Sequence, residues 1–439
     1  MKRLVTVCLF VCGGMTIASA QTPPVRLSLE DSIERGLAAN PRLDELQARQ
    51  DAARAVEGQR EAAELPQIAV VGAYTRINHV EEFSVPNPSG AFRVIYPDIP
   101  DQVRSRIDLQ WPIYTAGRLQ ALTRAAGAET NALEHDREAA RADLKLEITR
   151  AFWAVITARA SSDVLRQALE RTSAHLADVR NQFKVGLVPP SDVLTTEAQL
   201  ARQRMLSIEA ETLIETTTAE FRRLAGLDQD VPVELVPPAV TTSPIVAPFD
   251  GVAAKDLRVD RPERRSLNFR IAAAQDRVAA ASAGSLPVLT AIAGYDLARP
   301  NLKIFPIQDK WRPSWDVGIN VRWSLFDGGR VRAETAEAAA GQRAAEARLR
   351  DFDALVQVEV RQRLAEVKSS FAEIEAASTG ARAAAEARRV IAERFSAGVA
   401  TNTDVINAQS ALLFAELEVT RARANAELAN ARLMRALGR

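Results

Sequence analysis

Hydrophobic and polar residues alternate with two different periods along this chain, one near 3.6 residues and one of 2 residues. Between Gly117 and Gly186 the period is helical, because apolar residues recur at steps of three and four and no proline interrupts them. Leu144, Ile148 and Val155 belong to this series. The spacing predicts one continuous helix of roughly 100 Å. A helix of that length cannot lie inside a compact globule, so it must pack sideways against similar helices, as in a coiled coil.

Two segments with the period of 2 precede this helix and predict a pair of β-strands at about 67–114. In the second segment Ile107 and Leu109 point to one side, whereas Arg106 and Asp108 point to the other. A strand with one charged and one apolar face is typical of a strand between water and lipid. A hairpin packed on a soluble core has the same periodicity, so the pattern alone leaves both possibilities open.

The strand pattern returns later in the chain and predicts a second pair of strands at about 288–326. Between the strands of the first pair, the residues from 78 to 101 are polar and proline-rich, and we expect them to form a loop. The last strand of the second pair has the clearest alternation, with an apolar residue at every second position: Val317, Ile319, Val321, Trp323 and Leu325.

One stretch and its echo show that the chain repeats a single plan. Residues 183–194 are matched by residues 395–406, at a spacing of 212 positions. Each stretch stops one helical pattern with glycine and starts another, as in two antiparallel helices joined by a tight turn. The sequence therefore predicts two long helical hairpins, with tips at 186–191 and 398–403.

The repeat also predicts how the chain is divided. Residues 1–20 read as a secretory signal peptide, with a basic start, an apolar run and a small-residue cleavage site. The first repeat is expected at 21–225 and the second at 255–439. Between them, residues 226–254 contain five prolines and are expected to form an irregular linker.

Composition excludes several classes of protein. Lys+Arg and Asp+Glu are 56 each, so no field of one sign indicates nucleic acid. Both cysteines, Cys8 and Cys12, lie in the predicted signal peptide, which leaves no thiol for a disulfide or a thiolate metal site. The chain contains no Walker pattern, no Ser/His/Asp set and no metal-ligand spacing. We therefore expect no enzyme activity, no cofactor and no metal.

No run after the signal peptide approaches the ~20 apolar residues that a membrane-spanning helix requires. If the protein enters a membrane, it must do so as a β-barrel, and four strands cannot close one without leaving unpaired backbone groups in lipid. The strands must then close between chains, and three chains would supply twelve strands. Aromatic residues near the strand ends are expected to form an interfacial girdle in contact with outer-membrane lipid: Tyr74, Trp111, Tyr114, Tyr295 and Trp323.

The sequence resembles the TolC family of outer-membrane efflux and secretion proteins. The resemblance rests on the opening segment 27–41, on the strand-to-helix junctions 111–118 and 323–330, and on both hairpin tips. It implies a mixed fold in which a membrane β-barrel continues as a long α-helical barrel, with two structural repeats per chain, four strands and two long helical hairpins. It also implies a homotrimer in the outer membrane of a Gram-negative cell that extends into the periplasm.

The resemblance further implies partners and site residues. A periplasmic membrane-fusion adaptor would couple the protein to an inner-membrane pump of the RND or ABC type. Docking of the adaptor falls on six residues of the tips: Val185, Gly186, Leu187, Ala397, Gly398 and Val399. The lumen or its constriction falls on five residues: Asp192, Asp404, Asn407, Phe395 and Ala400.

The constriction residues depart from the pattern of some members of the family. Asp404 falls on an acidic ring that favours cations, but Asn407 stands where some members carry a second acid. Phe395 and Ala400 stand where those members carry a tyrosine and an arginine that latch the closed state. The closed state is therefore expected to be held differently here.

Several alternatives stay open at this stage. The tip glycines and the carboxylates of Asp192 and Asp404 could serve only as helix caps. The chain could also be a structural periplasmic coiled-coil protein without a channel, although such a scaffold has no use for amphipathic strands. Sequence alone does not separate efflux from type I secretion, and it names no substrate, adaptor or gating signal.

Overall fold

A computed structural model describes residues 24–238 and 260–438. The predicted signal peptide 1–20 and residues 239–254 of the predicted linker lie outside the described residues. The chain divides into two compact units, and each is described here by itself. Unit 1 comprises Met1–Asn40, Glu147–Ser243 and Ser370–Leu428; unit 2 comprises Pro41–Leu146, Pro244–Ser369 and Ala429–Arg439. Each unit combines segments from both halves of the sequence, and the division into two repeats stays a prediction.

The four long helices have the lengths that the repeat predicts. Helices α3 and α6 are 67 residues each, and the helices that follow them, α4 and α7, are 35 residues each. Their bounds are Arg118–Lys184 (α3), Pro190–Leu224 (α4), Arg330–Ser396 (α6) and Asn402–Ala436 (α7). Shorter helices are α2 (Pro41–Ala62), α5 (Pro262–Ser282) and the 3-10 turn η2 (Ala283–Ser285). In the described part of the chain, none of the helices combines the length and apolar character needed to cross a membrane.

Helix α1 (Leu29–Ala39) begins with a capping box. The Asp31 backbone N–H donates to the Ser28 hydroxyl at 3.1 Å, and the Ser28 backbone N–H donates to the Asp31 carboxylate at 3.2 Å. Just before it, β1 (Val25–Leu27) pairs in parallel with β6 (Val233–Leu235). Neither of these strands was predicted, because three residues are too few to establish a period of 2.

The core of unit 1 forms where α1 crosses α3 and the end of α4. Gly36 lies so close that an added Cβ would stand 2.5 Å from Ile148 Cδ1 and 2.7 Å from the Leu224 carbonyl oxygen. Phe152 and Phe221 are fully buried, with ring centroids 6.2 Å apart in an edge-on arrangement. Ile148 is also fully buried, as the helical spacing predicts.

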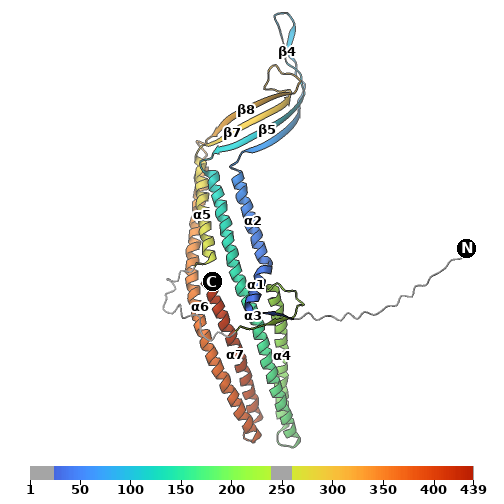
Figure 1. The fold of residues 1–439 in the computed structure, drawn as a ribbon, viewed down its shortest axis with the longest axis vertical. Helices are drawn as coiled ribbons and strands as arrows, with labels where there is room; N and C mark the ends of the chain where they lie inside the picture. The colour runs from blue at the N-terminus through green and yellow to red at the C-terminus, as the bar shows by residue number, and fades with distance from the viewer. Residues whose placement is uncertain (1–23, 239–259, 439) are drawn as a thin grey trace, which may run out of the picture. The chain divides into compact units, whose positions relative to one another are not determined.

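Unit 2 contains a four-stranded antiparallel sheet in the order β2-β5-β7-β8 (Figure 1). Its strands are β2 (Gln67–Arg76), β5 (Asp101–Tyr114), β7 (Val288–Arg299) and β8 (Arg312–Arg322). The central β5-β7 pair joins one strand from each half of the sequence. The outer edges of β2 and β8 have no partner strand among the described residues of the chain.

Two predictions about the strands were wrong in detail. The last strand ends at Arg322, which pairs with Val288 at the start of β7, so Trp323 and Leu325 have no strand beside them to pair with. Residues 78–101 are also more than a loop, because they contain a hairpin of β3 (Phe83–Pro86) and β4 (Phe92–Tyr96).

The turn of this hairpin contains residues that are typical of tight turns, Asn87 and Gly90. The Asn87 side chain accepts hydrogen bonds from the backbone N–H groups of Ser89 (3.0 Å) and Ala91 (3.2 Å), and Gly90 takes a left-handed φ of +82°. Asparagine followed by proline and glycine is typical of such a turn. The high proline content of residues 78–101 favours a loop, which is why the sequence did not predict these two strands.

Candidate functional site

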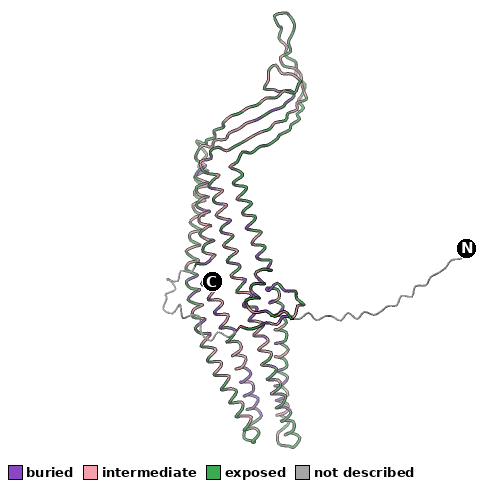
Figure 2. The backbone as a smooth tube through the Cα atoms, viewed as in Figure 1, coloured by how far each residue is buried: buried purple, intermediate pink, exposed green. Residues whose placement is uncertain are grey.

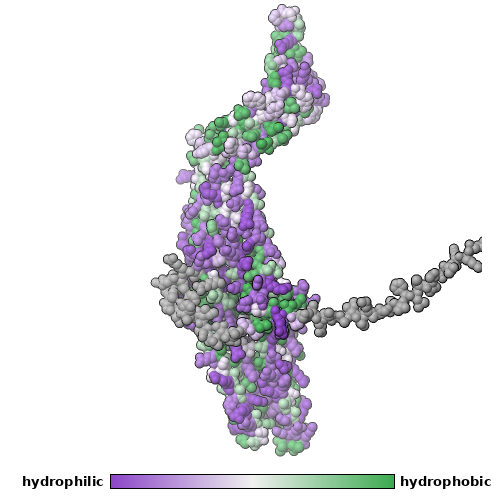
Figure 3. All heavy atoms as spheres, viewed as in Figure 1, coloured by the Kyte–Doolittle hydropathy of each residue, from purple (hydrophilic) through white to green (hydrophobic). Residues whose placement is uncertain are grey.

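One face of the sheet is apolar and exposed to solvent in the single chain (Figures 2 and 3). The register places Val70 beside Ile107, Ile107 beside Tyr295 and Tyr295 beside Trp315. Val70 is 71% exposed and Trp315 is 74% exposed. A large apolar face of this kind marks a surface that a membrane or another protein covers. Trp315 is missing from the predicted girdle, although it stands two positions before Val317 in the same alternation.

All five predicted girdle residues are exposed, by 43% to 63%: Tyr74, Trp111, Tyr114, Tyr295 and Trp323. The two tryptophans also hold the sheet to the preceding helices. The Trp111 indole N–H donates to the Glu64 carbonyl oxygen at 3.2 Å, and the Trp323 indole N–H donates to the Ser285 carbonyl oxygen at 3.1 Å. Each therefore satisfies a carbonyl just past the end of a helix, at matching places in the two halves. Their place in a girdle stays a prediction.

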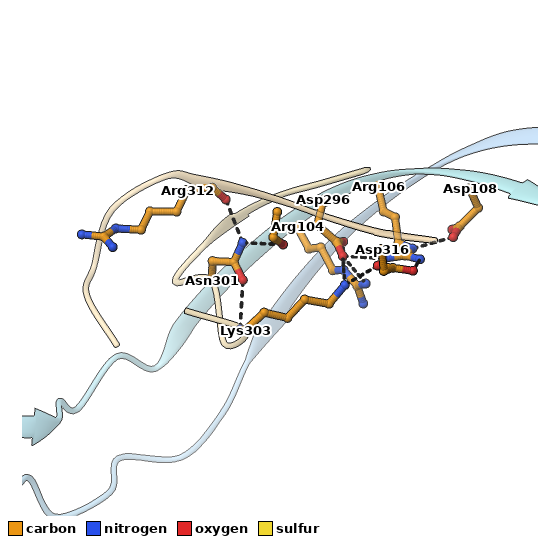
Figure 4. Close-up of polar contacts among 9 residues, drawn as sticks. Arg104, Arg106, Asp108, Asp296, Asn301, Lys303, Arg312 and Asp316 are labelled. Carbon is orange, nitrogen blue, oxygen red and sulfur yellow. Dashed lines mark hydrogen bonds and ion pairs between the residues drawn. The ribbon is translucent and has the colours of Figure 1, made fainter. Parts of the chain in front are cut away.

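The opposite face of the sheet carries a cluster of paired charges (Figure 4). The Arg106 guanidinium contacts Asp108 at 2.5 Å, Asp296 at 2.5 Å and Asp316 at 2.8 Å. To reach Asp316 on β8 it passes over Gly294 on β7, where an added Cβ would lie 2.0 Å from its Nη2 atom. Glycine at this position is what allows one arginine to bridge three strands.

The first hairpin tip closes with a left-handed glycine. Gly186 has φ +80°, and the Leu187 N–H donates to the Gln182 carbonyl at 2.9 Å, which terminates α3. Val185 is 70% exposed and Leu187 is 75% exposed. Helix α4 then begins behind Pro189 with no side-chain cap. Two bare apolar side chains on a rigid turn form a small surface suited to contact with another protein.

The second tip is built similarly but is capped. Gly398 has φ +72°, and exposed Ala397 and Val399 flank it. The Thr401 N–H and hydroxyl donate to the Asp404 carboxylate at 2.9 and 2.7 Å. The backbone hydrogen bond, reinforced by the hydroxyl, holds the pKa of Asp404 below its usual value. Asp404 is thus a helix cap, and it keeps its negative charge at the tip.

The other predicted constriction residues lie at different depths. Asn407 is exposed, whereas Asp192, Ala400 and Phe395 are half-buried. The Phe395 ring lies edge-on to His175 with centroids 5.2 Å apart. That these residues line a lumen stays a prediction.

Sequence reasoning missed a buried polar seam between the two hairpins in unit 1. The Asn402 side-chain oxygen lies 2.8 Å from His175 Nε2, and its amide donates to Thr196 Oγ1 and to the Asp192 carbonyl, both at 3.1 Å. Asn402 is 3% exposed, His175 8% and Thr196 0%. Further along, Thr172 donates to Gln409 at 3.0 Å. We call His175, Thr196 and Asn402 the tip seam.

The described residues contain no group of three or more His, Cys, Asp or Glu side chains that could hold a metal ion. The cavities in unit 1 are shallow grooves between helices; one of about 550 Å³ is lined mainly by apolar residues of α3, α4 and α7, including Trp153, Leu213 and Phe414.

Comparisons with known proteins agree with this arrangement. The model of one protein family, described as "Outer membrane efflux protein", matches residues 33–227 and 253–439. The outer membrane protein TolC of Vibrio cholerae is 24% identical over 100% of this chain and 96% of its own length. Protein CyaE of Bordetella pertussis is 26% identical over 71% of this chain and 66% of its own length. The outer-membrane channel OprN has a similar fold, with a TM-score of 0.78, 21% identity and coverage of 93% of this chain and 89% of that chain.

Proposed function

This chain belongs to the outer membrane efflux protein family, and from that premise we propose that it assembles into the passive exit duct of a tripartite efflux or type I secretion system. It is an outer-membrane protein. Substrate would pass from a pump or from the periplasm to the exterior. The observation that carries the proposal is the sheet, which has one apolar face, one charged face and two edges that no other described strand pairs with.

The unpaired edges give the proposal its oligomeric form. A sheet edge in lipid leaves backbone N–H and C=O groups without partners, and each costs several kcal/mol. Pairing β8 of one copy with β2 of the next removes every edge. Three copies would supply twelve strands, with the apolar face toward lipid and the charged face toward a water-filled lumen. Leu355 and Val358 on α6 are about 60% exposed in the single chain, which also favours a neighbouring copy against this helix.

The hairpin tips are the proposed docking surface for a periplasmic membrane-fusion adaptor, which would in turn bind an inner-membrane pump of the RND or ABC type. Support comes from Val185, Leu187 and Val399, which are exposed by 66% or more at the two hairpin tips. The tip seam lies just behind these turns. We propose that the tip seam holds the tip closed. It would do so in place of the latch of some family members, whose tyrosine and arginine are replaced here by Phe395 and Ala400.

Single-channel recording in a planar bilayer tests the proposed function. The purified, detergent-extracted protein should run as a heat-modifiable trimer and give stable, cation-leaning channels. Folded oligomer that inserts but never conducts, or a soluble coiled-coil oligomer that does not insert, would overturn the proposal in favour of a structural scaffold. Co-purification of an RND or an ABC pump with its adaptor would then separate efflux from type I secretion.

Asp404→Asn should reduce the preference for cations, because it removes a charge that the lowered pKa keeps ionised. Thr401→Val is the matched variant, since it removes the hydroxyl hydrogen bonds of the same cap but leaves the carboxylate in place. Reversal potentials in asymmetric KCl measure the effect. If both variants leave selectivity unchanged and only loosen the tip, Asp404 is a cap and nothing more. The cap itself should persist above the ordinary carboxyl pKa and weaken as the pH falls through the lowered value.

A further inference from the structure

The loop between β7 and β8, residues 300–311, is fastened to the charged face of the sheet. The Lys303 ammonium contacts Asp296 at 2.8 Å and Asp316 at 2.5 Å (Figure 4). Asp296 is 2% exposed, whereas the Lys303 side chain is 45% exposed, so a half-exposed ammonium pairs with a buried carboxylate. Strand β7 follows α5 in the chain and β8 precedes α6, and the two strands are antiparallel. The loop that joins them therefore lies at the end of the sheet opposite these two helices.

A second attachment lies two residues earlier in the loop. Asn301 is 4% exposed, and its side-chain amide donates to the Arg312 carbonyl and to the Ser314 hydroxyl, both at 2.9 Å. Its side-chain oxygen accepts from the Lys303 backbone N–H at 3.0 Å. The asparagine therefore shapes the turn that aims Lys303 at the sheet.

The charges of the sheet face are incomplete without this loop. The strands supply three carboxylates to the cluster but only two guanidinium groups: Asp108, Asp296 and Asp316 against Arg104 and Arg106. Lys303 supplies the missing positive charge. Buried and half-buried carboxylates are stable only when paired. The carboxylates of the sheet face therefore bind the loop through Lys303.

The fastened loop exposes three large apolar side chains: Leu302 at 60%, Phe305 at 71% and Trp311 at 48%. On a face that lines an aqueous path, apolar side chains form a constriction that resists wetting and so hinders ions. Three copies would bring three such loops to the same level of the duct.

We propose that residues 300–311 form a strap, held by Lys303 and Asn301, that narrows the outer mouth of the duct and acts as a second gate separate from the hairpin tips. The inference rests on the proposed function, since it requires the charged face to line a lumen. Release of Lys303 from its two carboxylates frees the strap and widens the mouth.

Lys303→Met tests the strap by removing the charge while keeping the length of the side chain. We expect the single-channel conductance to rise by about twofold or more, with longer open times. Lys310→Met is the matched control, because Lys310 lies in the same loop and its side chain makes no hydrogen bond or ion pair within the described residues. If the two variants change the conductance equally, the effect is one of charge alone and the strap is refuted.

An engineered disulfide provides a second test of the strap that does not depend on charge. The chain has no cysteine beyond Cys12, so Asn301→Cys with Ser314→Cys introduces a single pair at side chains that now touch. In the Lys303→Met background, the oxidised protein should conduct like the wild type or less, and reduction should restore the high conductance of Lys303→Met. Equal conductance before and after reduction would overturn the proposal. A wild-type protein that forms no channel would instead refute the proposed function, so the two failures are distinguishable.

Discussion

Tryptophan in place of Gly186 or Gly398 is expected to abolish export while the assembled protein stays in the outer membrane. Both glycines are exposed with φ near +80° and +72°, and nothing lies within 4 Å of an added Cβ, so the indole would project outward. It would then stand between the tip and the proposed adaptor. Loss of a central interface contact typically costs about 2–4 kcal/mol, or roughly 30-fold or more in affinity. Crosslinking to the adaptor and dye efflux in cells lacking the native protein measure the effect.

Two further glycine variants separate docking from backbone strain. Gly90→Trp places the same side chain at φ +82° with equally open surroundings, but in the β3-β4 turn of unit 2, and should leave export intact. Gly186→Ala imposes the strain of a left-handed residue at about 1 kcal/mol without the bulk, and should weaken export only slightly. Normal export by Gly186→Trp, with the protein correctly assembled, would rule out docking at this tip.

Asn402→Leu is expected to open the tip. The leucine removes three hydrogen bonds of the tip seam and leaves the buried His175 ring nitrogen without its partner, at a cost of about 2 kcal/mol. Since these bonds tie the start of α7 to α3 and α4, their loss favours separation of the hairpins. A shift of about 1.4 kcal/mol changes an equilibrium tenfold, so resting open probability should rise by roughly tenfold or more.

Gln203→Leu is the matched control for this variant. Gln203 lies on α4 in the same unit and is 1% exposed, but neither its amide nitrogen nor its oxygen has a hydrogen-bond partner among the residues that the structure describes. Its replacement by leucine removes an unsatisfied polar group and should leave conductance unchanged and stability equal or higher. Resting conductance and protease sensitivity of the tip are the measurements. Closed channels in Asn402→Leu would show that the seam stabilises the fold without gating it.

The long helices were predictable because one local signal, an apolar residue at every third or fourth position, recurs over many turns. Glycine at each end and the absence of proline between them define α3 within one residue, and Ser28 with Asp31 marks the start of α1. The four strands of the main sheet were predictable, because β5 and β8 alternate over many residues, whereas β1, β6 and the β3-β4 hairpin were not predicted. Their ends were less predictable, since a strand stops where its neighbour stops, as Arg322 does beside Val288.

The parts that could not be predicted depend on contacts between segments far apart in sequence. His175 and Asn402 are 227 positions apart, and neither belongs to a motif that indicates the other. Lys303 lies in a loop whose composition resembles any exposed turn, and only the positions of Asp296 and Asp316 on the same face give it a role. Single-sequence patterns describe periods along the chain, whereas these sites arise from register between strands and helices.

The charge cluster on the sheet makes the two halves of this chain unlike partners. At the spacing of 212 positions, Arg104 of the first half corresponds to Asp316 of the second, and Arg106 corresponds to Gly318. The first half supplies the two arginines that reach across the sheet, and the second half supplies the two aspartates that they contact there. Two first halves placed side by side would set arginine against arginine, and two second halves would set aspartate against aspartate. The two halves of the sheet are therefore complementary in charge where β5 meets β7 and β8, and neither strand set can replace the other at this contact.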